Sequence, residues 1–273
     1  GKYDVIISNK VKLDRRILQA SRGIKLICVA ATGTNNIDLQ AAAEFNIKVC
    51  NVTAYATASV VQHVFALILA LQTRLFELTH AVAKGEWSSS PHFSLLDYPV
   101  NELAGKTLGI VGYGTLGKAV AQIAQAFGMQ VLIAKRNDQD KRTGRMPLKE
   151  MLPLVDVLSL HCPLTEETEN LLDENEFSEM KSSAILINTA RGGIVNETAL
   201  LHALESQQIA AAGIDVLSVE PPPEDHPLLT RKQSNLIVTP HVAWASQQSR
   251  QRLLNEIALN ITAFIAGESS SPV

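Results

Sequence analysis

The stretch KTLGIVGYGTLG, residues 106–117, decides the fold, because a short apolar run leads directly into a glycine-rich turn. The apolar run predicts a strand at 106–112, and the residues after the turn predict a helix at 116–127. A second strand is expected at 129–134. A strand, a tight turn, a helix and a second strand in this order are typical of a parallel α/β unit.

The glycines of this turn form a G-x-G-x-x-G pattern at Gly112, Gly114 and Gly117. The first glycine permits the tight turn, the second lets a pyrophosphate approach the backbone, and the third lets helix and strand pack closely. The helix N-terminus, with Thr115 and Leu116, would offer unpaired N–H groups to the phosphates. In this setting we favour a dinucleotide-binding loop over a purely structural glycine turn.

The rest of the chain repeats the alternation of apolar runs and amphipathic stretches, with seven more strands and five more helices. Strands are expected at 3–8, 25–30, 47–52, 155–161, 183–189, 210–216 and 235–240, and helices at 14–21, 37–45, 147–153, 174–180 and 196–207. Strands that are apolar on both faces indicate parallel sheets covered by helices. The predicted fold class is α/β with two doubly wound parallel-sheet domains, a Rossmann-type nucleotide-binding domain at 55–242 and a smaller flavodoxin-like substrate domain at 1–54 and 243–273.

Composition excludes several other classes of protein. The 273 residues are 46% hydrophobic and 19% charged with a net charge of −3, which gives no general attraction to nucleic acid or to an anionic membrane. The three cysteines, Cys28, Cys50 and Cys162, lie far apart along the chain, so we expect neither a disulfide framework nor a metal site. A reducing, cytoplasmic location fits this cysteine usage best.

Residues 57–84 predict one long helix that is apolar almost all round. Its longest uninterrupted apolar run, 64–71, has eight residues, whereas a membrane span needs about 20. Such a helix is buried either between domains or against another chain. We expect a homodimer in which two of these helices bury their apolar faces.

The second strand of the nucleotide-binding unit ends in Lys135 and Arg136, where a carboxylate commonly holds the adenosine ribose. These two cations favour the 2′-phosphate of NADP over NAD. Two alternatives remain open, because Asp138 or the loop backbone could serve NAD, and the charged run at 135–145 could simply be a solvated loop.

Arg191, Glu220 and His241 each follow a predicted strand, at the edge where open α/β sheets bind their ligands. An arginine can hold a carboxylate and polarise a neighbouring carbonyl. A histidine can give or take the proton of a hydroxyl group, and a carboxylate beside it favours the imidazolium. Spacing alone leaves open a surface ion pair for Arg191, a loop charge for Glu220 and a strand-end cap for His241.

Four motifs make the chain resemble the D-isomer-specific 2-hydroxyacid dehydrogenases: GYGTLG, NTARGGIVNETALLHAL (188–204), GIDVLSVEPP (213–222) and TPHVAW (239–244). Within that family, ATGTNNIDL (31–39) and DYP (97–99) look most like the glycerate dehydrogenase and hydroxypyruvate reductase group. Relatives begin with about one further strand–helix unit, so the substrate domain is expected to be N-terminally incomplete.

The resemblance implies a role for each matching position. Arg191 would bind substrate, Glu220 would be the partner carboxylate and His241 the acid and base. The loop of Thr32, Gly33 and Thr34 would bind the substrate carboxylate together with Arg191 and His241. Positions implied to line the cofactor, besides the glycine loop and Lys135 and Arg136, are Cys162, Pro163, Thr168, Thr189, Ala190, Asp215, His241 and Ala243.

Three further sites have mainly structural interpretations. His161 and Cys162 could form a metal pair, but adjacent strand residues point apart, which favours packing. His63 is interpreted as a hydrogen-bonded interface histidine. Trp244 either borders the substrate or fills the domain interface, with no preference between the two.

Together these observations predict an oxidoreductase that interconverts a small 2-keto acid and its D-2-hydroxy acid with NAD(P)H, hydroxypyruvate and D-glycerate being the leading pair. One alternative is a phosphoglycerate dehydrogenase, although the loop at 31–36 holds no Lys or Arg for a phosphate. Another is a dinucleotide-sensing corepressor with feeble turnover and peptide partners.

Overall fold

The computed structural model describes residues 3–21, 23–230 and 234–268. Its contacts divide the chain into two compact units, one made of residues 1–59 and 244–273 and the other of residues 60–243. The sequence placed these divisions at 54/55 and 242/243. The chain therefore enters the first unit, builds the whole of the second, and returns to the first.

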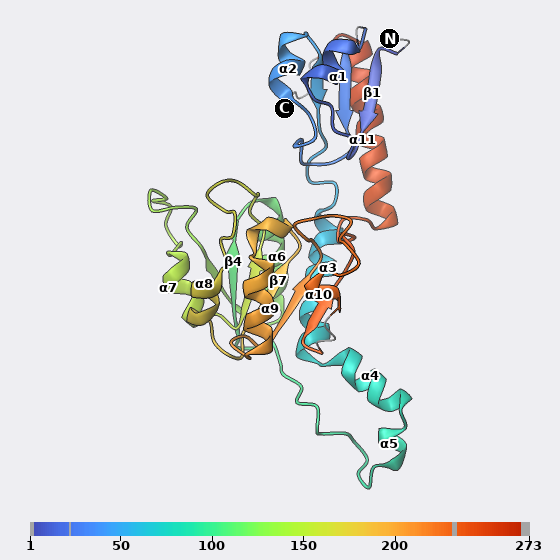
Figure 1. Ribbon diagram of the computed structural model, residues 1–273. Coiled ribbons are helices and arrows are strands. Elements are labelled where there is room, and N and C mark those ends of the chain that lie inside the picture. The colour runs from blue at the N-terminus through green and yellow to red at the C-terminus, as the bar shows by residue number, and fades with distance from the viewer. Residues whose placement is uncertain (1–2, 22, 231–233, 269–273) are drawn as a thin grey trace. The chain divides into compact units, whose positions relative to one another are not determined.

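The first unit contains a parallel three-stranded sheet in the order β1-β2-β3. Its strands are β1 (Val5–Ser8), β2 (Leu26–Val29) and β3 (Lys48–Cys50). Helices α1 (Arg15–Ala20) and α2 (Leu39–Glu44) contribute to the apolar cluster on one face, and α11 (Gln247–Ile265) covers the other (Figure 1). The sequence did not predict α11, although Leu253, Ile257 and Ile261 recur every fourth residue. Leu253 and Ile257 belong to the cluster against β2, and Ile261 packs against it.

Two cysteines of this sheet meet in space. Cys28 and Cys50 are register partners on β2 and β3, and their sulfur atoms lie 3.4 Å apart. Both are free thiols in the core, and the neighbouring Cys50 together with burial raises the pKa of Cys28. The separation of these cysteines along the chain therefore did not predict their distance in space, because adjacent parallel strands bring distant residues together.

The second unit contains a parallel six-stranded sheet in the order β5-β4-β6-β7-β8-β9. The strands are β4 (Thr107–Val111), β5 (Gln130–Ile133), β6 (Val157–Leu160), β7 (Ile185–Asn188), β8 (Ala211–Ile214) and β9 (Leu236–Val238). With β1 to β3, all nine expected strands are present, and the predicted α/β class with two parallel sheets is confirmed.

Helices cover both faces of the six-stranded sheet (Figure 1). One face packs in a single apolar cluster with residues from the helices that follow β5, β6 and β7, whereas α3 lies against the other face, where Leu67 touches Gly213 of β8. The helices of this unit are α3 (Thr57–Gln72), α4 (Leu75–Ala83), α5 (Glu86–Ser89), α6 (Thr115–Ala126), α7 (Leu148–Met151), α8 (Glu174–Glu179), α9 (Glu197–Glu205) and α10 (Pro227–Thr230), with 3-10 turns at Leu152–Leu154 and Gly192–Ile194.

The prediction of one helix at 57–84 is wrong. The chain breaks between α3 and α4, with an angle of 57° between the two helices. Arg74 adopts a left-handed conformation at φ 50°, which an α-helix cannot contain. In the described part of the chain no single helix has the length and apolarity to cross a membrane, and α3 and α4 pass that test only as a bent pair.

The apolar side chains of α3 are largely buried, whereas many of those in the segment that follows are exposed. Val64, Phe65 and Ile68 of α3 are buried, and Phe65 stacks on Phe127. The segment at 75–100, which we call the arm, extends away from the sheet in Figure 1. Its large apolar side chains that remain exposed are Leu75, Phe76, Val82, Trp87, Phe93, Leu96 and Val100.

Candidate active site

The glycine loop lies where the strand order of the sheet reverses, with β5 on one side of β4 and β6 on the other. Gly112 adopts φ 97°, and a Cβ there would lie 2.5 Å from the main-chain nitrogen of Cys162. A Cβ on Gly117 would lie 2.2 Å from the Gly112 oxygen. These two positions therefore require glycine to bring β4, β6 and α6 together.

Gly114 differs, because a Cβ there would meet nothing within 4 Å. It precedes the 12-residue helix α6 and supplies no capping side chain, so the first N–H groups of α6 lack a side-chain acceptor from that position. After β7, the Thr189 hydroxyl is buried without a hydrogen-bond partner among the described residues. Open space beside a helix N-terminus and an orphaned hydroxyl fit a bound dinucleotide.

The loop after β5 is folded around Asp140. This buried carboxylate accepts hydrogen bonds from Arg142 Nη2 at 2.6 Å, Arg145 Nη1 at 3.1 Å and the Arg136 main-chain nitrogen at 3.0 Å. The Arg142 guanidinium and the Arg136 N–H hold the pKa of Asp140 well below its usual range. The Asp140 carboxylate is therefore hydrogen-bonded within its own loop, while Arg136 is exposed and Lys135 is half-buried.

The loop after β6 begins with two uncharged side chains. Burial lowers the pKa of His161 to about 4, and its ring lies 2.9 Å from the Ser159 hydroxyl. Burial also raises the pKa of Cys162 to about 11. Among the described residues, no group of three or more His, Cys, Asp or Glu side chains could hold a metal ion. Thr168 donates to the Pro163 carbonyl at 2.7 Å and so shapes the next turn.

The structure brings Glu220 and His241 together. His241 Nδ1 lies 2.6 Å from Glu220 Oε2, and Glu220 Oε1 accepts the Leu217 N–H at 3.0 Å. His241 is partly exposed and adopts φ 53°. The loops after β8 and β9 thus place a carboxylate beside one nitrogen of an imidazole ring, a group that can give or take a proton.

Asp215 fixes the turn that carries His241. Its carboxylate is 1% exposed and accepts the N–H groups of Val242 at 3.0 Å and Ala243 at 2.9 Å. It also accepts the Thr239 hydroxyl at 2.5 Å, and that hydroxyl lies 2.9 Å from His63 Nε2. Sequence reasoning missed this network, although a buried acid directly after β8 was a signal for it. His63 is hydrogen-bonded, as expected, and its partner Thr239 belongs to the same unit.

Arg191 follows β7 on the neighbouring loop. It is half-buried, and its Nη1 donates to the Ala190 carbonyl at 2.7 Å. Asn188 binds the Arg191 carbonyl at 2.8 Å, which holds the turn. The next residue, Gly192, lies against the loop of Glu220, because a Cβ there would be 1.9 Å from the carbonyl carbon of Leu217. The Arg191 and Glu220 loops are therefore in direct contact.

Thr32, Gly33 and Thr34 lie in the first unit, between β2 and α2. Thr32 donates from its hydroxyl to Val52 O at 3.0 Å, and Asn51 binds the Thr32 carbonyl at 2.6 Å. Trp244 also belongs to this unit, where it packs edge-on against Tyr55 with ring centroids 6.4 Å apart. It is partly buried and packs against the apolar cluster that includes Leu253 and Ile257 of α11.

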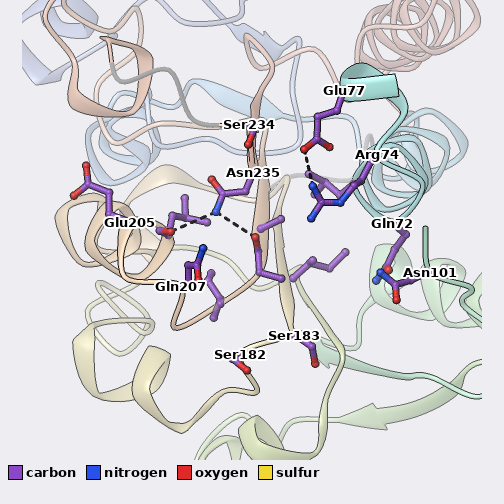
Figure 2. Close-up of a pocket in the computed structure, with 16 residues that line it drawn as sticks. Gln72, Arg74, Glu77, Asn101, Ser182, Ser183, Glu205, Gln207, Ser234 and Asn235 are labelled. Atoms are coloured by element: carbon purple, nitrogen blue, oxygen red, sulfur yellow. Dashed lines mark hydrogen bonds and ion pairs between the residues drawn. The ribbon is translucent and has the colours of Figure 1, made fainter. Parts of the chain in front are cut away.

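A large cavity lies elsewhere, at the opposite edge of the six-stranded sheet. It has a volume of about 730 Å³ and borders the amino ends of β7, β8 and β9 at Ile185, Ala211 and Asn235 (Figure 2). One wall is the Arg74–Glu77 ion pair, at 2.8 Å. The side chains predicted from the motifs all lie outside this cavity.

Comparison with known proteins identifies the family. The NAD-binding domain of the D-isomer specific 2-hydroxyacid dehydrogenases matches residues 65–243. Glycerate dehydrogenase from Methylorubrum extorquens is 43% identical over 270 residues, which cover 99% of this chain and 85% of that protein. Hydroxypyruvate reductase from Blautia hydrogenotrophica is 40% identical, with 100% of this chain and 84% of that protein covered.

A solved structure agrees with these sequence relatives. The TT0316 protein from Thermus thermophilus superposes with a TM-score of 0.88 at 35% identity, over 97% of this chain and 84% of that one. Fold, glycine loop and relatives therefore agree. The chain belongs to the D-isomer specific 2-hydroxyacid dehydrogenase family, whose members are oxidoreductases that act on a CH–OH group with NAD(P).

Proposed function

We propose that this enzyme interconverts hydroxypyruvate and D-glycerate. The observation that carries the proposal is the 2.6 Å contact between His241 and Glu220, on a loop that touches the Arg191 loop at Gly192. The relatives named glycerate dehydrogenase and hydroxypyruvate reductase, at 43% and 40% identity, favour this substrate pair over other small 2-keto acids.

Each residue has a chemical task in this proposal. Arg191 binds the substrate carboxylate. His241 donates a proton to the keto oxygen during reduction and removes it during oxidation, while Glu220 orients the ring and stabilises the imidazolium. A nicotinamide cofactor, when bound, would supply or accept the hydride. The open space at Gly114 and the hydroxyl of Thr189 belong to the cofactor side.

The test is a set of initial rates with hydroxypyruvate, glyoxylate and pyruvate on the purified protein. Highest kcat/KM with hydroxypyruvate supports the proposal. Preference for glyoxylate would replace the substrate and keep the enzyme class. Tight cofactor binding without turnover of any acid would contradict the proposal and favour a dinucleotide sensor, and turnover restricted to phosphorylated hydroxy acids would favour a phosphoglycerate dehydrogenase.

We propose NADP as the preferred cofactor. Asp140, the buried carboxylate of this loop, is already bonded to Arg142 and Arg145, so it adds little repulsion against a 2′-phosphate. Lys135 and exposed Arg136 supply the positive charge at the strand end. The double variant Lys135→Ala/Arg136→Ala should raise KM for NADPH about tenfold and leave KM for NADH within about twofold. A wild type that prefers NADH would contradict this assignment.

We propose a homodimer formed through the arm at 75–100 rather than through α3. Phe93 is 92% exposed and Leu96 is 84% exposed, whereas the apolar residues of α3 are largely buried in their own unit. A second copy of the chain would remove this apolar surface from water. Sedimentation should show a dimer for the wild type and a monomer for Phe93→Ser/Leu96→Ser. A monomeric wild type would contradict the proposal.

A further inference from the structure

A single carboxylate, that of Glu197, holds the loop between β8 and α10 at two points. Glu197 is the first residue of α9. Its Oε1 accepts the Ser218 N–H at 2.7 Å, and its Oε2 accepts the Ser218 hydroxyl at 2.9 Å. Oε2 also lies 3.1 Å from His226 Nε2. Ser218 and His226 thus converge on one side chain, and Glu220 lies between them in the chain.

The bonding around His226 fixes its tautomer. The ring is 7% exposed, and its Nδ1 accepts the Leu228 N–H at 3.3 Å. Because Nδ1 acts as an acceptor, Nε2 carries the proton and donates it to Glu197. Three donors therefore point at the Glu197 carboxylate, which matches an acceptor-only group. A carboxamide in its place would point an N–H at one of these donors.

This arrangement leads directly to the catalytic pair. Leu217, the neighbour of Ser218, donates its N–H to Glu220 Oε1 at 3.0 Å. Glu220 Oε2 in turn lies 2.6 Å from His241 Nδ1. Gly192 packs closely against the Leu217 main chain, which restricts the movement of Leu217. A displacement of Ser218 therefore moves the group that orients Glu220.

We propose that Glu197 is a positioning residue for the reaction, because it anchors the 217–226 loop so that Glu220 stays bonded to His241. The inference rests on the roles that the proposed function gives to Glu220 and His241. Glu197 acts on this pair through Ser218 and His226. Its removal should loosen the His241–Glu220 pair and so disfavour the imidazolium.

The test is an NMR titration of the His241 ring in the full-length protein, assigned by the signal lost in His241→Gln. Glu220→Gln should move the titration midpoint to lower pH, because the carboxylate beside the ring is lost, and Glu197→Gln should move it in the same direction by a smaller amount. Ser218→Ala removes the hydroxyl bond to Glu197 Oε2 without changing charge and keeps the main-chain N–H bond to Oε1. It should therefore move the midpoint in the same direction by a smaller amount. His226→Gln keeps an N–H group that can donate to Glu197, so the titration midpoint of His241 in this variant should stay near that of the wild type.

Controls separate positioning from a general loss of charge. The carboxylates attached to this network are Glu220, on the ring itself, and Asp215, whose main-chain oxygen accepts the His241 N–H. Neither charge changes in Glu197→Gln or Ser218→Ala. Glu179→Gln, an exposed acid on the neighbouring helix α8, should leave the midpoint unmoved. Kinetically, the high-pH limb of the reductive kcat/KM profile should follow the NMR midpoint while KM for cofactor stays constant.

The proposal is overturned if Glu220→Gln moves the His241 titration midpoint, Ser218→Ala leaves it unchanged, and about 0.5 M salt removes any shift caused by Glu197→Gln. Such a result would show that Glu197 acts only as a distant charge. If Glu197→Gln fails to fold, Ser218→Ala decides alone. The titration needs no substrate, so a wild type without turnover would contradict the proposed function while this measurement still tests the anchor.

Discussion

The two edges of the six-stranded sheet differ in how closely their residues pack. At the carboxyl edge, glycines allow main chains to approach so closely that a Cβ on Gly112 or Gly192 would lie 2.5 or 1.9 Å from a neighbouring backbone atom. The polar side chains there, Asp215, Glu220 and His241, are tied into specific hydrogen bonds. At the amino edge a cavity of about 730 Å³ is lined by polar residues such as Gln207 and Asn235.

The large cavity and the polar side chains of the proposed site therefore lie at opposite edges of this sheet. In a parallel sheet the loops and helix N-termini that can bind anions all lie at the carboxyl edge. The connections at the amino edge end helices and begin strands, so their N–H groups are used in the sheet itself. Several variants can test this contrast between the edges.

The largest expected effect is on catalysis. His241→Gln, at the carboxyl edge, should lower kcat/KM for the preferred acid by about 10²–10⁴-fold, because the proton donor is lost. Asn235→Ala, at the amino edge, removes hydrogen bonds to Leu204 O and Ala210 O and should cost about 1 kcal/mol of stability with unchanged kcat/KM. Steady-state rates and urea unfolding measure both. A large catalytic loss in Asn235→Ala would contradict the assignment of chemistry to one edge.

The next effect concerns packing at the carboxyl edge. In Gly192→Ala the new Cβ would overlap the Leu217 main chain at 1.9 Å, which should lower the free energy of unfolding by about 3 kcal/mol and disturb Glu220. Gly193→Ala is the matched control, since its Cβ would meet only the flexible Leu164 side chain at 3.3 Å. Urea unfolding compares the two. Equal stabilities would show that the loops can move apart freely.

A smaller effect is the pH dependence of stability that comes from His161. Burial lowers its pKa to about 4, below the value of an unfolded histidine, so the unfolded state binds more protons. Stability from this group is therefore complete above about pH 6.5 and is lost as the pH falls toward 4, by about 2 kcal/mol between pH 7 and 5. Urea unfolding of wild type and His161→Gln at both pH values measures it. An identical pH dependence in the two proteins would contradict the burial of the ring.

The smallest effect separates two glycines of one loop. Gly114→Ala places a Cβ in open space at φ −87°, so the free energy of unfolding should change by less than about 1 kcal/mol. Dinucleotide affinity should fall about tenfold, because the methyl group occupies the space left for the pyrophosphate. Fluorescence titration with NADPH and NADH measures it. Unchanged affinity would place the dinucleotide away from Gly114.

Sequence patterns predicted best the features that depend on residues close to one another along the chain. The nine strands were predicted because each is a short apolar run between turn residues, and the glycine loop was predicted because strand, turn and helix are contiguous. The helix α11 was missed, since its apolar stripe of Leu253, Ile257 and Ile261 is interrupted by many polar residues on the exposed face. The break at Arg74 was missed because apolarity continues through it.

What the sequence determined by itself was the α/β class and the glycine loop, and it predicted Arg191, Glu220 and His241 as a set. What only the tertiary structure decided was which side chains meet: the 2.6 Å contact of Glu220 with His241, the bonding of Asp215 to the turn at 242–243, and the two anchors of Glu197. The physical reason is that a parallel sheet brings together strand ends that lie about 20 or more residues apart, and a hydrogen bond depends on tenths of an ångström that periodicity along the chain does not encode.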